Sequence, residues 1–357
     1  MIRCDALVVG GGPAGSTCAW LLRRAGWDVV VADRARFPRD KVCAGWLTPH
    51  VFAALELDPA EYRAAGLTLQ EITAFRTGVL GGPLVETQYD RVVSYAIRRC
   101  EFDDFLLRRA NVRVLEDTPV AEVRRERDRW IVNDAIEAGV LIGAGGHFCP
   151  VARHAADDDD PAPVVAKEAE FRLPRRNGAS DIPELFFCGD LEGYAWSVRK
   201  GEYLNVGIGR RRREGFNGHV QAFIEFLQRR QAFDGATGVR WRGHAYLALG
   251  AGRRRASGEA LLLVGDAAGL AYPESGEGIR PAVESGRLAA ETLIAAGGRR
   301  GADDLAPYAA ALAQRHPPLR PWPAPLKPVA AAIGRGLLRS PAFTRHVLLD
   351  RWFLRAV

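Results

Sequence analysis

The chain has 357 residues, of which 48% are hydrophobic and 26% charged, an ordinary globular composition that allows two or three structural units. The formal net charge of +6 is concentrated near one end. Residues 297–357 contain ten Lys or Arg and three Asp or Glu, which leaves 39 basic and 40 acidic side chains for the rest. A general nucleic-acid-binding surface is therefore not expected.

The six cysteines lie far apart, without the paired spacing of a zinc site, so we expect free thiols and no metal. The sequence has no run of apolar residues long enough to span a bilayer, and no secretory-type apolar segment precedes the first predicted strand. These features predict a cytoplasmic protein.

The N-terminal residues have the pattern of a βαβ unit. Residues 5–10 are an apolar run that ends in glycines, as in a buried parallel strand, and residues 27–32 are a second such run. Residues 16–24 between them have helical periodicity, which Gly26 ends.

The turn between the first strand and the helix reads Gly10-Gly-Gly12-Pro-Ala14-Gly15 and fits the motif GxGxxG. In this motif the first glycine permits a tight turn, the second lets the backbone approach a diphosphate, and the third allows the helix to pack closely on the strand. Asp33 ends the second strand and is expected to accept a hydrogen bond from a ribose hydroxyl. The motif indicates a dinucleotide without specifying which one.

The middle of the chain is less regular. Residues 103–110 predict a helix that leads into a strand over 112–115, and residues 140–142 predict another strand. Residues 185–188 and 203–208 are expected to be strands of an antiparallel sheet.

Near the C-terminus, residues 261–264 predict a buried strand and residues 279–295 a helix. Six prolines within 317–328 predict an extended connector, and a basic helical tail follows.

A second motif selects the dinucleotide. Gly265-Asp266 ends the strand at 261–264, and a Pro-x-x-Gly-x-Gly segment at 273–278 opens the next helix. A carboxylate at Asp266 can bind the ribityl hydroxyls of a flavin, and backbone N–H groups at 276–279 can hydrogen-bond the flavin pyrimidine edge. A nicotinamide dehydrogenase needs no such second element. The two motifs together predict non-covalently bound FAD.

Several further segments share a pattern with known flavoproteins. They are Phe37-Pro-Arg39-Asp-Lys41-Val-Cys43-Ala-Gly45, Arg99-x-x-Phe102-Asp103, Gly265-Asp266, Pro273-x-x-Gly276-x-Gly278, and Tyr194-Ala-Trp196 followed by Tyr203-Leu-Asn-Val-Gly-Ile-Gly209. With them the sequence resembles the geranylgeranyl reductase family. That family lies within the larger group of aromatic-hydroxylase-like flavoproteins, which also includes flavin-dependent halogenases.

The resemblance implies an α/β fold with a Rossmann-type FAD-binding domain, an inserted β-sheet substrate domain and a helical C-terminal region, with the flavin ring between the domains. The expected segments are 1–50, 92–160 and 255–296 for the FAD-binding domain, 51–91 and 161–254 for the substrate domain, and 297–357 for the C-terminal region.

The resemblance also implies a set of site residues. The expected cofactor-binding residues are Gly10, Gly12, Ala14, Gly15, Asp33, Arg34, Arg39, Cys43, Ala44, Arg99, Gly265, Asp266, Gly276, Gly278 and Ile279. The candidate catalytic residues are Cys43, Tyr194 and Trp196. Reductases of this type carry a cysteine that faces the flavin, and the two aromatic residues are candidates for the wall of an apolar substrate cavity.

For the charged positions, purely structural roles are the alternative to cofactor binding. Arg39 and Lys41 could be solvated charges at a loop rim, and Arg99 could form a helix-surface salt bridge with Asp103. No clear general acid stands out, and Cys43 and Tyr194 are the candidates for that role.

The sequence departs from the family pattern at several positions. Gly145 stands where the family usually has Asp, Cys43-Ala-Gly45 replaces C-G-G, and Val198-Arg199-Lys200 replaces an F-P ending. The last two changes lie near the expected substrate side, so the identity of the substrate does not follow from the resemblance.

The activity implied by the resemblance is FAD-dependent reduction of C=C bonds in an isoprenoid, with NAD(P)H or a redox protein as electron donor. The same scaffold supports oxygen activation by a monooxygenase or halogenase, although the W-x-W-x-I-P element of many halogenases reads Tyr194-Ala-Trp196-Ser-Val198-Arg199 here. A non-catalytic flavin-binding protein is a third alternative.

The tail interleaves apolar residues with arginines, which suits an amphipathic helix that contacts anionic lipid. The alternative is a helix that caps the substrate domain and has its basic face exposed to solvent. The protein is therefore expected to be cytoplasmic, with peripheral contact at the inner face of the membrane as the further expectation.

Overall fold

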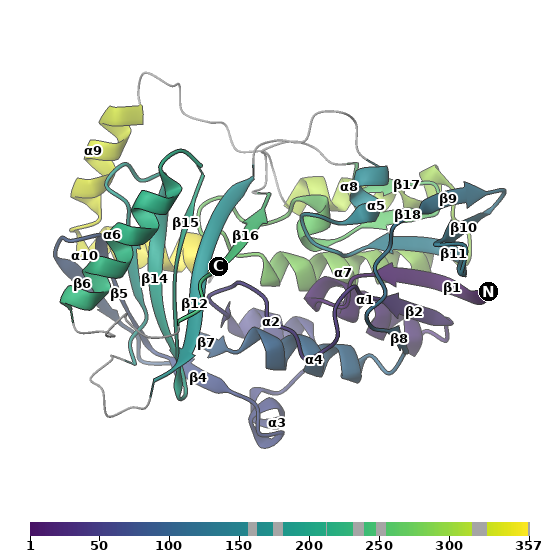
Figure 1. Cartoon of the computed structure of the whole chain (residues 1–357), viewed down its shortest axis with the longest axis horizontal. Coiled ribbons are helices and arrows are strands. Elements are labelled where there is room, and N and C mark those ends of the chain that lie inside the picture. Colours follow the sequence, from purple (N-terminus) through teal and green to yellow (C-terminus); the bar gives the residue numbers. More distant parts are fainter. Residues whose placement is uncertain are drawn as a thin grey trace.

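The computed structural model describes residues 1–155, 163–173, 181–211, 213–230, 239–247, 255–315 and 327–355. Two large sheets lie side by side along the long axis of the molecule, and helices cover their faces (Figure 1). The N-terminus lies at the outer end of one sheet, whereas the C-terminus lies near the middle of the view.

The first sheet has eight strands in the order β17-β18-β11-β1-β2-β8, with a β9–β10 hairpin paired to β11. Its strands are β1 (Ile2–Val9), β2 (Val29–Ala32), β8 (Arg113–Leu115), β9 (Val123–Glu126), β10 (Arg129–Val132), β11 (Ile136–Gly143), β17 (Ser257–Gly258) and β18 (Leu261–Leu263). The central run from β18 to β8 is parallel. Strands buried on both faces are near-continuous apolar runs, which is why these segments could be recognised in the sequence.

Five helices accompany the first sheet. They are α1 (Pro13–Arg24), α4 (Arg99–Arg109), α5 (Pro150–His154), α7 (Ile279–Ala295) and α8 (Ala302–Arg315). Helices α1 and α7 pack closely because Gly286 has no side chain, and a Cβ atom there would collide with the carbonyl oxygen of Ala14. This contact brings the two nucleotide motifs together, although they are more than 250 residues apart in the sequence.

The second sheet has seven strands in the order β16-β12-β15-β14-β13-β5-β6. Its strands are β5 (Ala74–Val79), β6 (Leu84–Gln88), β12 (Val164–Arg172), β13 (Glu184–Phe187), β14 (Gly193–Lys200), β15 (Tyr203–Arg210) and β16 (Arg242–Tyr246). Neighbours are antiparallel except for β13 and β5, which run parallel. The strands expected at 185–188 and 203–208 correspond to β13 and β15.

A small sheet, β3-β7-β4, lies between the two large ones. It consists of β3 (Trp46–Leu47), β4 (Leu69–Ile72) and β7 (Ser94–Ile97). Helices α2 (Pro49–Ala54) and α3 (Pro59–Ala64) share an apolar core with this sheet and α4. The small sheet combines strands from both expected domains, and the domain boundaries themselves stay a prediction.

Separate apolar cores stabilise the two faces of the second sheet. Helix α6 (Phe216–Arg229) covers one face through Val220, Phe223 and Leu227. The C-terminal segment covers the other face with Leu348, Leu349 and Phe353. It contains α9 (Lys327–Leu337), α10 (Pro341–Phe343) and a π-helical stretch over Thr344–Phe353.

The expectation of an extended connector over 317–328 is corrected at its end. Helix α9 begins at Lys327, so Pro328 lies in its first turn, where a missing backbone N–H costs no helical hydrogen bond. The remaining prolines of the segment lie outside the described residues.

Candidate active site

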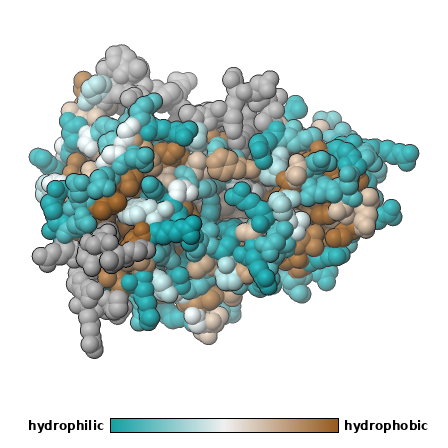
Figure 2. All heavy atoms as spheres, viewed as in Figure 1, coloured by the Kyte–Doolittle hydropathy of each residue, from teal (hydrophilic) through white to brown (hydrophobic). Residues whose placement is uncertain are grey.

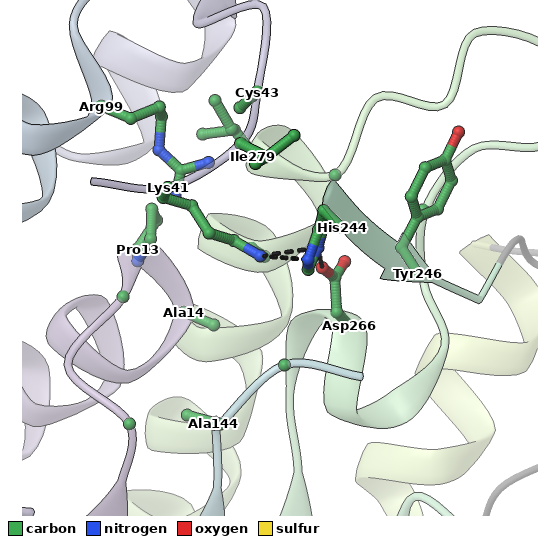
Figure 3. A pocket seen from close by; sticks show the side chains of 18 of the residues that line it. Pro13, Ala14, Lys41, Cys43, Arg99, Ala144, His244, Tyr246, Asp266 and Ile279 are labelled. Carbon is green, nitrogen blue, oxygen red and sulfur yellow. Dashed lines mark hydrogen bonds and ion pairs between the residues drawn. The ribbon is translucent and has the colours of Figure 1, made fainter. Parts of the chain in front are cut away.

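A cavity of about 590 Å³ lies between the two large sheets. Its walls come from the β1–α1 turn, the segment after β2, the start of α4, strands β14 and β16, and the loop before α7. Figure 3 shows side chains from these distant segments pointing toward one space. The site therefore exists only when the two sheets pack against each other.

The glycine turn forms one end of the cavity. Gly10 has φ +115°, and a Cβ atom there would collide with the carbonyl of Ala144, so only glycine is tolerated. A Cβ atom on Gly12 would approach only the guanidinium of Arg39, at 3.4 Å. Gly12 is the N-cap of α1, so this helix end has no side-chain cap. This positive helix end is thus open toward the cavity and suits a diphosphate.

Asp33 braces the glycine turn from the end of β2. Its carboxylate accepts hydrogen bonds from the backbone N–H of Gly11 at 2.8 Å and of Ala35 at 2.9 Å. The side chain is buried and lines the cavity. A carboxylate has further acceptor capacity, so these bonds are compatible with the predicted contact to a ribose hydroxyl.

A buried ion-pair cluster lies beside the turn. Arg99 donates two hydrogen bonds to Asp103, at 2.8 and 2.9 Å, and Arg39 pairs with the same carboxylate at 3.2 Å. Both arginines also line the cavity. The salt bridge expected as the alternative for Arg99 is therefore present, but it lies inside the protein and fixes both guanidinium groups at the cavity wall.

Lys41 extends into the cavity and meets residues of two other elements (Figure 3). Its Nζ lies 2.6 Å from Nε2 of His244 on β16, and the same imidazole nitrogen lies 3.9 Å from a carboxylate oxygen of Asp266. Lys41 therefore does not occupy the solvated rim position that was the alternative.

Burial governs the charges of this triad. It lowers the pKa of Lys41 to about 8, against the opposing attraction of Asp266. Burial also lowers the pKa of His244, so the imidazole is neutral at pH 7. For Asp266, burial raises the pKa, but the hydrogen bond with His244 and the charge of Lys41 outweigh it, and the net shift is downward. Asp266 is consequently a carboxylate that can accept hydrogen bonds.

The loop before α7 forms the opposite wall. Gly276 has φ +67°, and a Cβ atom there would collide with the hydroxyl of Tyr246. Tyr194 on β14 donates a hydrogen bond from its hydroxyl to the backbone carbonyl of Ser275. The two tyrosines thus fix the backbone of this loop against the second sheet.

Cys43 is held at the cavity by its backbone. Its N–H donates a 2.7 Å hydrogen bond to Glu168, and its carbonyl lies 3.4 Å from Nζ of the fully buried Lys200. Lys200 also pairs with Glu170 at 2.8 Å. Lys200 belongs to the segment that departs from the family pattern, and it now has a structural role as a support for the Cys43 loop.

The end of the cavity next to the second sheet is aromatic. Phe353 packs against Trp46 and Tyr194, with ring centroids 5.6 and 5.5 Å apart, and Trp196 lies next to Tyr194 at 6.0 Å. All four residues line the cavity. The indole N–H of Trp196 is satisfied by Asn205 at 2.7 Å, so the exposed ring face is apolar.

Most of the residues expected from the sequence lie around this one cavity. Of the expected site residues, only Gly15 and Gly265 do not line it. A Cβ atom on Gly15 would collide with the carbonyl of Gly10, and one on Gly265 would lie 3.2 Å from Cβ of Ala14. These two glycines therefore allow close packing behind the site. The individual roles of the expected residues stay predictions.

Residue 145, where the family's Asp is missing, also lies at the cavity wall. A Cβ atom on Gly145 would lie 3.2 to 3.4 Å from atoms of Cys149. A larger side chain at 145 would therefore require Cys149 to shift, so the glycine matches its local packing.

Sequence reasoning did not identify several of the cavity-lining residues, among them His244, Tyr246, Glu277 and Phe353. Glu277 had a signal, since it lies between two glycines of the recognised motif. The others had none, because their contribution depends on which face of the second sheet, or of the C-terminal segment, meets the cavity.

Comparisons with known proteins agree with this geometry. Residues 5–99 match the family model described as FAD dependent oxidoreductase. The menaquinone reductase of Mycobacterium tuberculosis is 32% identical, with 81% of this chain and 76% of that protein covered. The geranylgeranyl diphosphate reductase of Rhodobacter capsulatus is 28% identical, with coverages of 82% and 76%.

Among solved structures, a geranylgeranyl bacteriochlorophyll reductase-like protein from Thermoplasma acidophilum has the same fold. The TM-score is 0.73 at 20% identity, and the match covers 95% of this chain and 88% of that one. The predicted Rossmann-type α/β class is therefore confirmed.

The glycine cradle, the open helix end and the strand-end carboxylates fit FAD, and the protein is an FAD-dependent oxidoreductase. Its similarity to the two reductases above, over about four-fifths of its length, narrows the class to one family. The chain belongs to the geranylgeranyl reductase family.

Two further findings concern the described parts of the chain. None of the helices there is both long and apolar enough to cross a membrane. No group of three or more His, Cys, Asp or Glu residues in the same ranges is arranged to hold a metal ion.

Proposed function

We propose that the protein reduces C=C bonds in an isoprenoid chain and that the aromatic end of the cavity binds this chain. The observation that carries the proposal is the continuity of one cavity, which joins a polar, glycine-lined end to an end walled by Trp46, Tyr194, Trp196 and Phe353. An apolar chain is stabilised by such a wall through burial of its surface, whereas a charged substrate loses solvation there. The names of the two reductase relatives support the same substrate class.

The cofactor-binding roles are proposed from the same positions. Gly10, Gly12 and Ala14 would surround the diphosphate at the α1 N-terminus. Asp33 and Arg34 would contact the adenosine ribose side, with Arg39 and Arg99 beside the diphosphate.

The flavin half of the cofactor would meet the other wall. Asp266 would bind the ribityl hydroxyls, and the backbone of Gly276, Gly278 and Ile279 would bind the pyrimidine edge. Cys43 and Ala44 would lie on the substrate side. When bound, FAD supplies the hydride chemistry of the reaction.

The electron donor is proposed to be NAD(P)H in transient contact with the site, or a redox protein. The sequence has a single GxGxxG segment, which is used for FAD in this proposal. A second, permanently bound dinucleotide is therefore not part of it.

A monooxygenase or halogenase is the second candidate, and one observation favours it. Lys41 points into the cavity, and burial lowers its pKa to about 8, as suits a lysine that exchanges protons near neutral pH. The absence of the halogenase W-x-W-x-I-P element from the sequence weighs against this candidate.

The deciding experiment uses the purified, FAD-loaded protein, reduced with dithionite under anaerobic conditions. Geranylgeranyl diphosphate is added and the oxidised-flavin absorbance is followed, with the fully saturated phytanyl diphosphate as a matched control. We expect the oxidised spectrum to return only with the unsaturated compound, together with a product heavier by two hydrogens per reduced bond. Menaquinone is tested in parallel, and mass spectrometry distinguishes reduction of its side chain from reduction of its ring.

Other outcomes point elsewhere. If the flavin stays reduced until air enters and then passes through a hydroperoxide-like spectrum, the monooxygenase candidate replaces the reductase. A purified protein that binds no flavin would support a non-catalytic role and contradict both.

We further propose that the protein contacts an anionic membrane surface through α9. Val329, Ile333 and Leu337 are 58%, 60% and 40% exposed, and their spacing of four places them along one side of the helix. We call this set the α9 stripe. Arg335 and Arg339 are exposed nearby, so the surface combines apolar and cationic groups. Figure 1 places α9 at the upper-left end of the molecule, and in the same view Figure 2 shows a few hydrophobic side chains among hydrophilic ones at that end.

We assign the two expectations for the tail to different parts of it. The π-helical stretch over Thr344–Phe353 caps the second sheet with buried residues, whereas the α9 stripe faces outward. Contact with a lipid surface would bring an apolar substrate close to the protein, at the peripheral position on the inner face of the membrane that we propose.

A further inference from the structure

Glu277 is a buried carboxyl group in the cavity wall that the proposed function leaves without a role. It lies between Gly276 and Gly278, the two glycines proposed to hold the flavin pyrimidine edge, and it lines the cavity. Both carboxyl oxygens are inaccessible to solvent, and neither makes a well-formed hydrogen bond with any described residue. A buried, unpaired carboxylate is costly, so the site favours a protonated group.

The groups around Glu277 act in opposite directions. Burial is the dominant influence and raises its pKa to about 7, while the guanidinium groups of Arg280 and Arg355 lower it and Glu284 raises it. The backbone N–H of Arg280 approaches the carboxyl without reaching good hydrogen-bond geometry.

The arginines themselves are occupied elsewhere. Arg280 pairs with Glu284 at 2.8 Å, and Arg355 pairs with Glu274 at 2.9 Å. Two tyrosines lie close enough to Glu277 to interact with its charge, namely Tyr194 from β14 and Tyr272 from the loop before α7. Neither carries a competing charge, because burial raises the pKa of both phenols.

We propose that Glu277 is the proton donor of this site, delivering its carboxyl proton to the substrate carbon that does not receive the hydride. In this step the O–H bond of Glu277 breaks and a new C–H bond forms as the C=C π bond is lost. The second hydrogen and both electrons come from the reduced cofactor, which is thereby oxidised. Glu277 is left as a carboxylate and is reprotonated before the next turnover by water that enters the cavity when the product leaves. This inference rests on the proposed function.

The two earlier candidates for the acid suit the role less well. Tyr194 has a pKa raised well above its ordinary value, and its hydroxyl already donates to the carbonyl of Ser275. Cys43 uses its sulfur to accept a hydrogen bond from the N–H of Gly45 at 3.4 Å. Glu277 combines a neutral form near pH 7 with a position in the cavity wall and carboxyl oxygens that hydrogen-bond to no described residue.

The test compares the wild type with Glu277→Gln, Glu277→Asp and the matched control Glu274→Gln, each as the FAD-loaded full chain. Glu274 lies in the same loop but pairs with Arg355 and does not line the cavity. After anaerobic reduction with dithionite, geranylgeranyl diphosphate is added, and the rate of flavin reoxidation is measured across the pH range. FAD affinity is measured separately by equilibrium titration.

We expect the wild-type rate to fall about tenfold per pH unit above pH 7, as the donor loses its proton. Glu277→Gln should lower the rate about 10²- to 10⁴-fold and abolish this pH dependence, with little change in FAD affinity. Glu277→Asp should restore part of the rate, and Glu274→Gln should keep the wild-type profile. A Glu277→Gln variant with wild-type rate and pH profile would overturn the inference.

A second readout does not depend on turnover. In FAD-loaded protein with ¹³C-labelled glutamate carboxyls, one signal that is absent from Glu277→Gln should titrate near pH 7. If every glutamate signal titrates below about pH 5, the inference fails whatever the substrate is. If the signal titrates near 7 but no isoprenoid reoxidises the wild-type flavin, the proposed function fails and, with it, the assignment of Glu277 as donor to an alkene.

Discussion

Nζ of Lys41 lies 2.6 Å from Nε2 of His244, although the two residues are 203 positions apart in the sequence. Lys41 comes from the segment after β2 and His244 from β16, so this contact joins the two large sheets across the cavity. Asp266 completes the cluster from the loop after β18. A lysine in such a buried position has a depressed pKa. Titration of the Lys41 amine can therefore test whether this contact forms.

The first prediction concerns the titration of Lys41. The protein has four lysines, and reductive methylation with ¹³C-formaldehyde gives each a separate NMR signal. We expect one signal to titrate near pH 8, because burial lowers the pKa of Lys41, and to be absent from Lys41→Arg. Lys167→Arg is the control and should retain it. Titration of all four signals above about pH 10 would contradict the buried position.

The second prediction concerns cofactor binding by Asp266. Asp266→Ala should weaken FAD binding by about 1.5 to 3 kcal/mol, roughly 10- to 100-fold, because hydrogen bonds from the ribityl chain to a carboxylate are lost. Flavin absorbance per protein after gel filtration measures this loss. Asp304→Asn is the control, since Asp304 pairs with Arg299 and neither residue lines the cavity. Full flavin retention in Asp266→Ala would show that the ribityl site lies elsewhere.

The third prediction concerns the aromatic end of the cavity. Phe353 is 4% exposed, so Phe353→Ala should lower the free energy of unfolding by about 3 to 5 kcal/mol in urea titrations. It should also enlarge the cavity and raise relative activity on longer isoprenoid chains. Leu349→Ala is matched, since Leu349 is buried in the same tail but does not line the cavity. Equal chain-length selectivity in both variants would argue against substrate contact by Phe353.

The fourth prediction follows from the raised pKa of Glu277. The folded state binds this proton more tightly than the unfolded state, whose carboxyl titrates near its ordinary value of 4.5. Its stabilising contribution is therefore fully present below about pH 4.5 and is lost as the pH rises through 7, by at most about 3 kcal/mol. The wild-type Tm should consequently fall more between pH 5 and pH 8 than that of Glu277→Gln. Parallel curves for the two proteins would contradict the prediction.

The fifth prediction concerns the α9 stripe. The triple variant Val329→Ser, Ile333→Ser, Leu337→Ser should bind phosphatidylglycerol vesicles about tenfold more weakly or worse in cosedimentation, because apolar burial in the interface is lost. Raising the salt concentration should weaken wild-type binding through screening of the arginines. Ile294→Ser, an exposed isoleucine on α7, is the control. Unchanged binding by the triple variant would exclude this surface as the contact.

The sequence by itself determined the cofactor class and the parallel strands of the first sheet. The glycines at 10, 12 and 15 and the carboxylates Asp33 and Asp266 act through local geometry. All of them except Gly15 lie just after the end of a buried parallel strand, and Gly15 lies in the first turn of the helix that follows β1. Buried parallel strands are continuous apolar runs, so β1, β2 and β18 could be recognised without knowledge of their partners.

Only the tertiary structure decided how the cavity is closed and charged. The contact of Lys41 with His244, the burial of Glu277 and the arrival of Phe353 all require the second sheet and the tail to pack against the nucleotide-binding half. Side-chain burial sets pKa values, and burial is a property of the packed fold rather than of neighbours in sequence. For this reason the sequence predicted where the flavin binds, while the candidate proton donor emerged only from the structure.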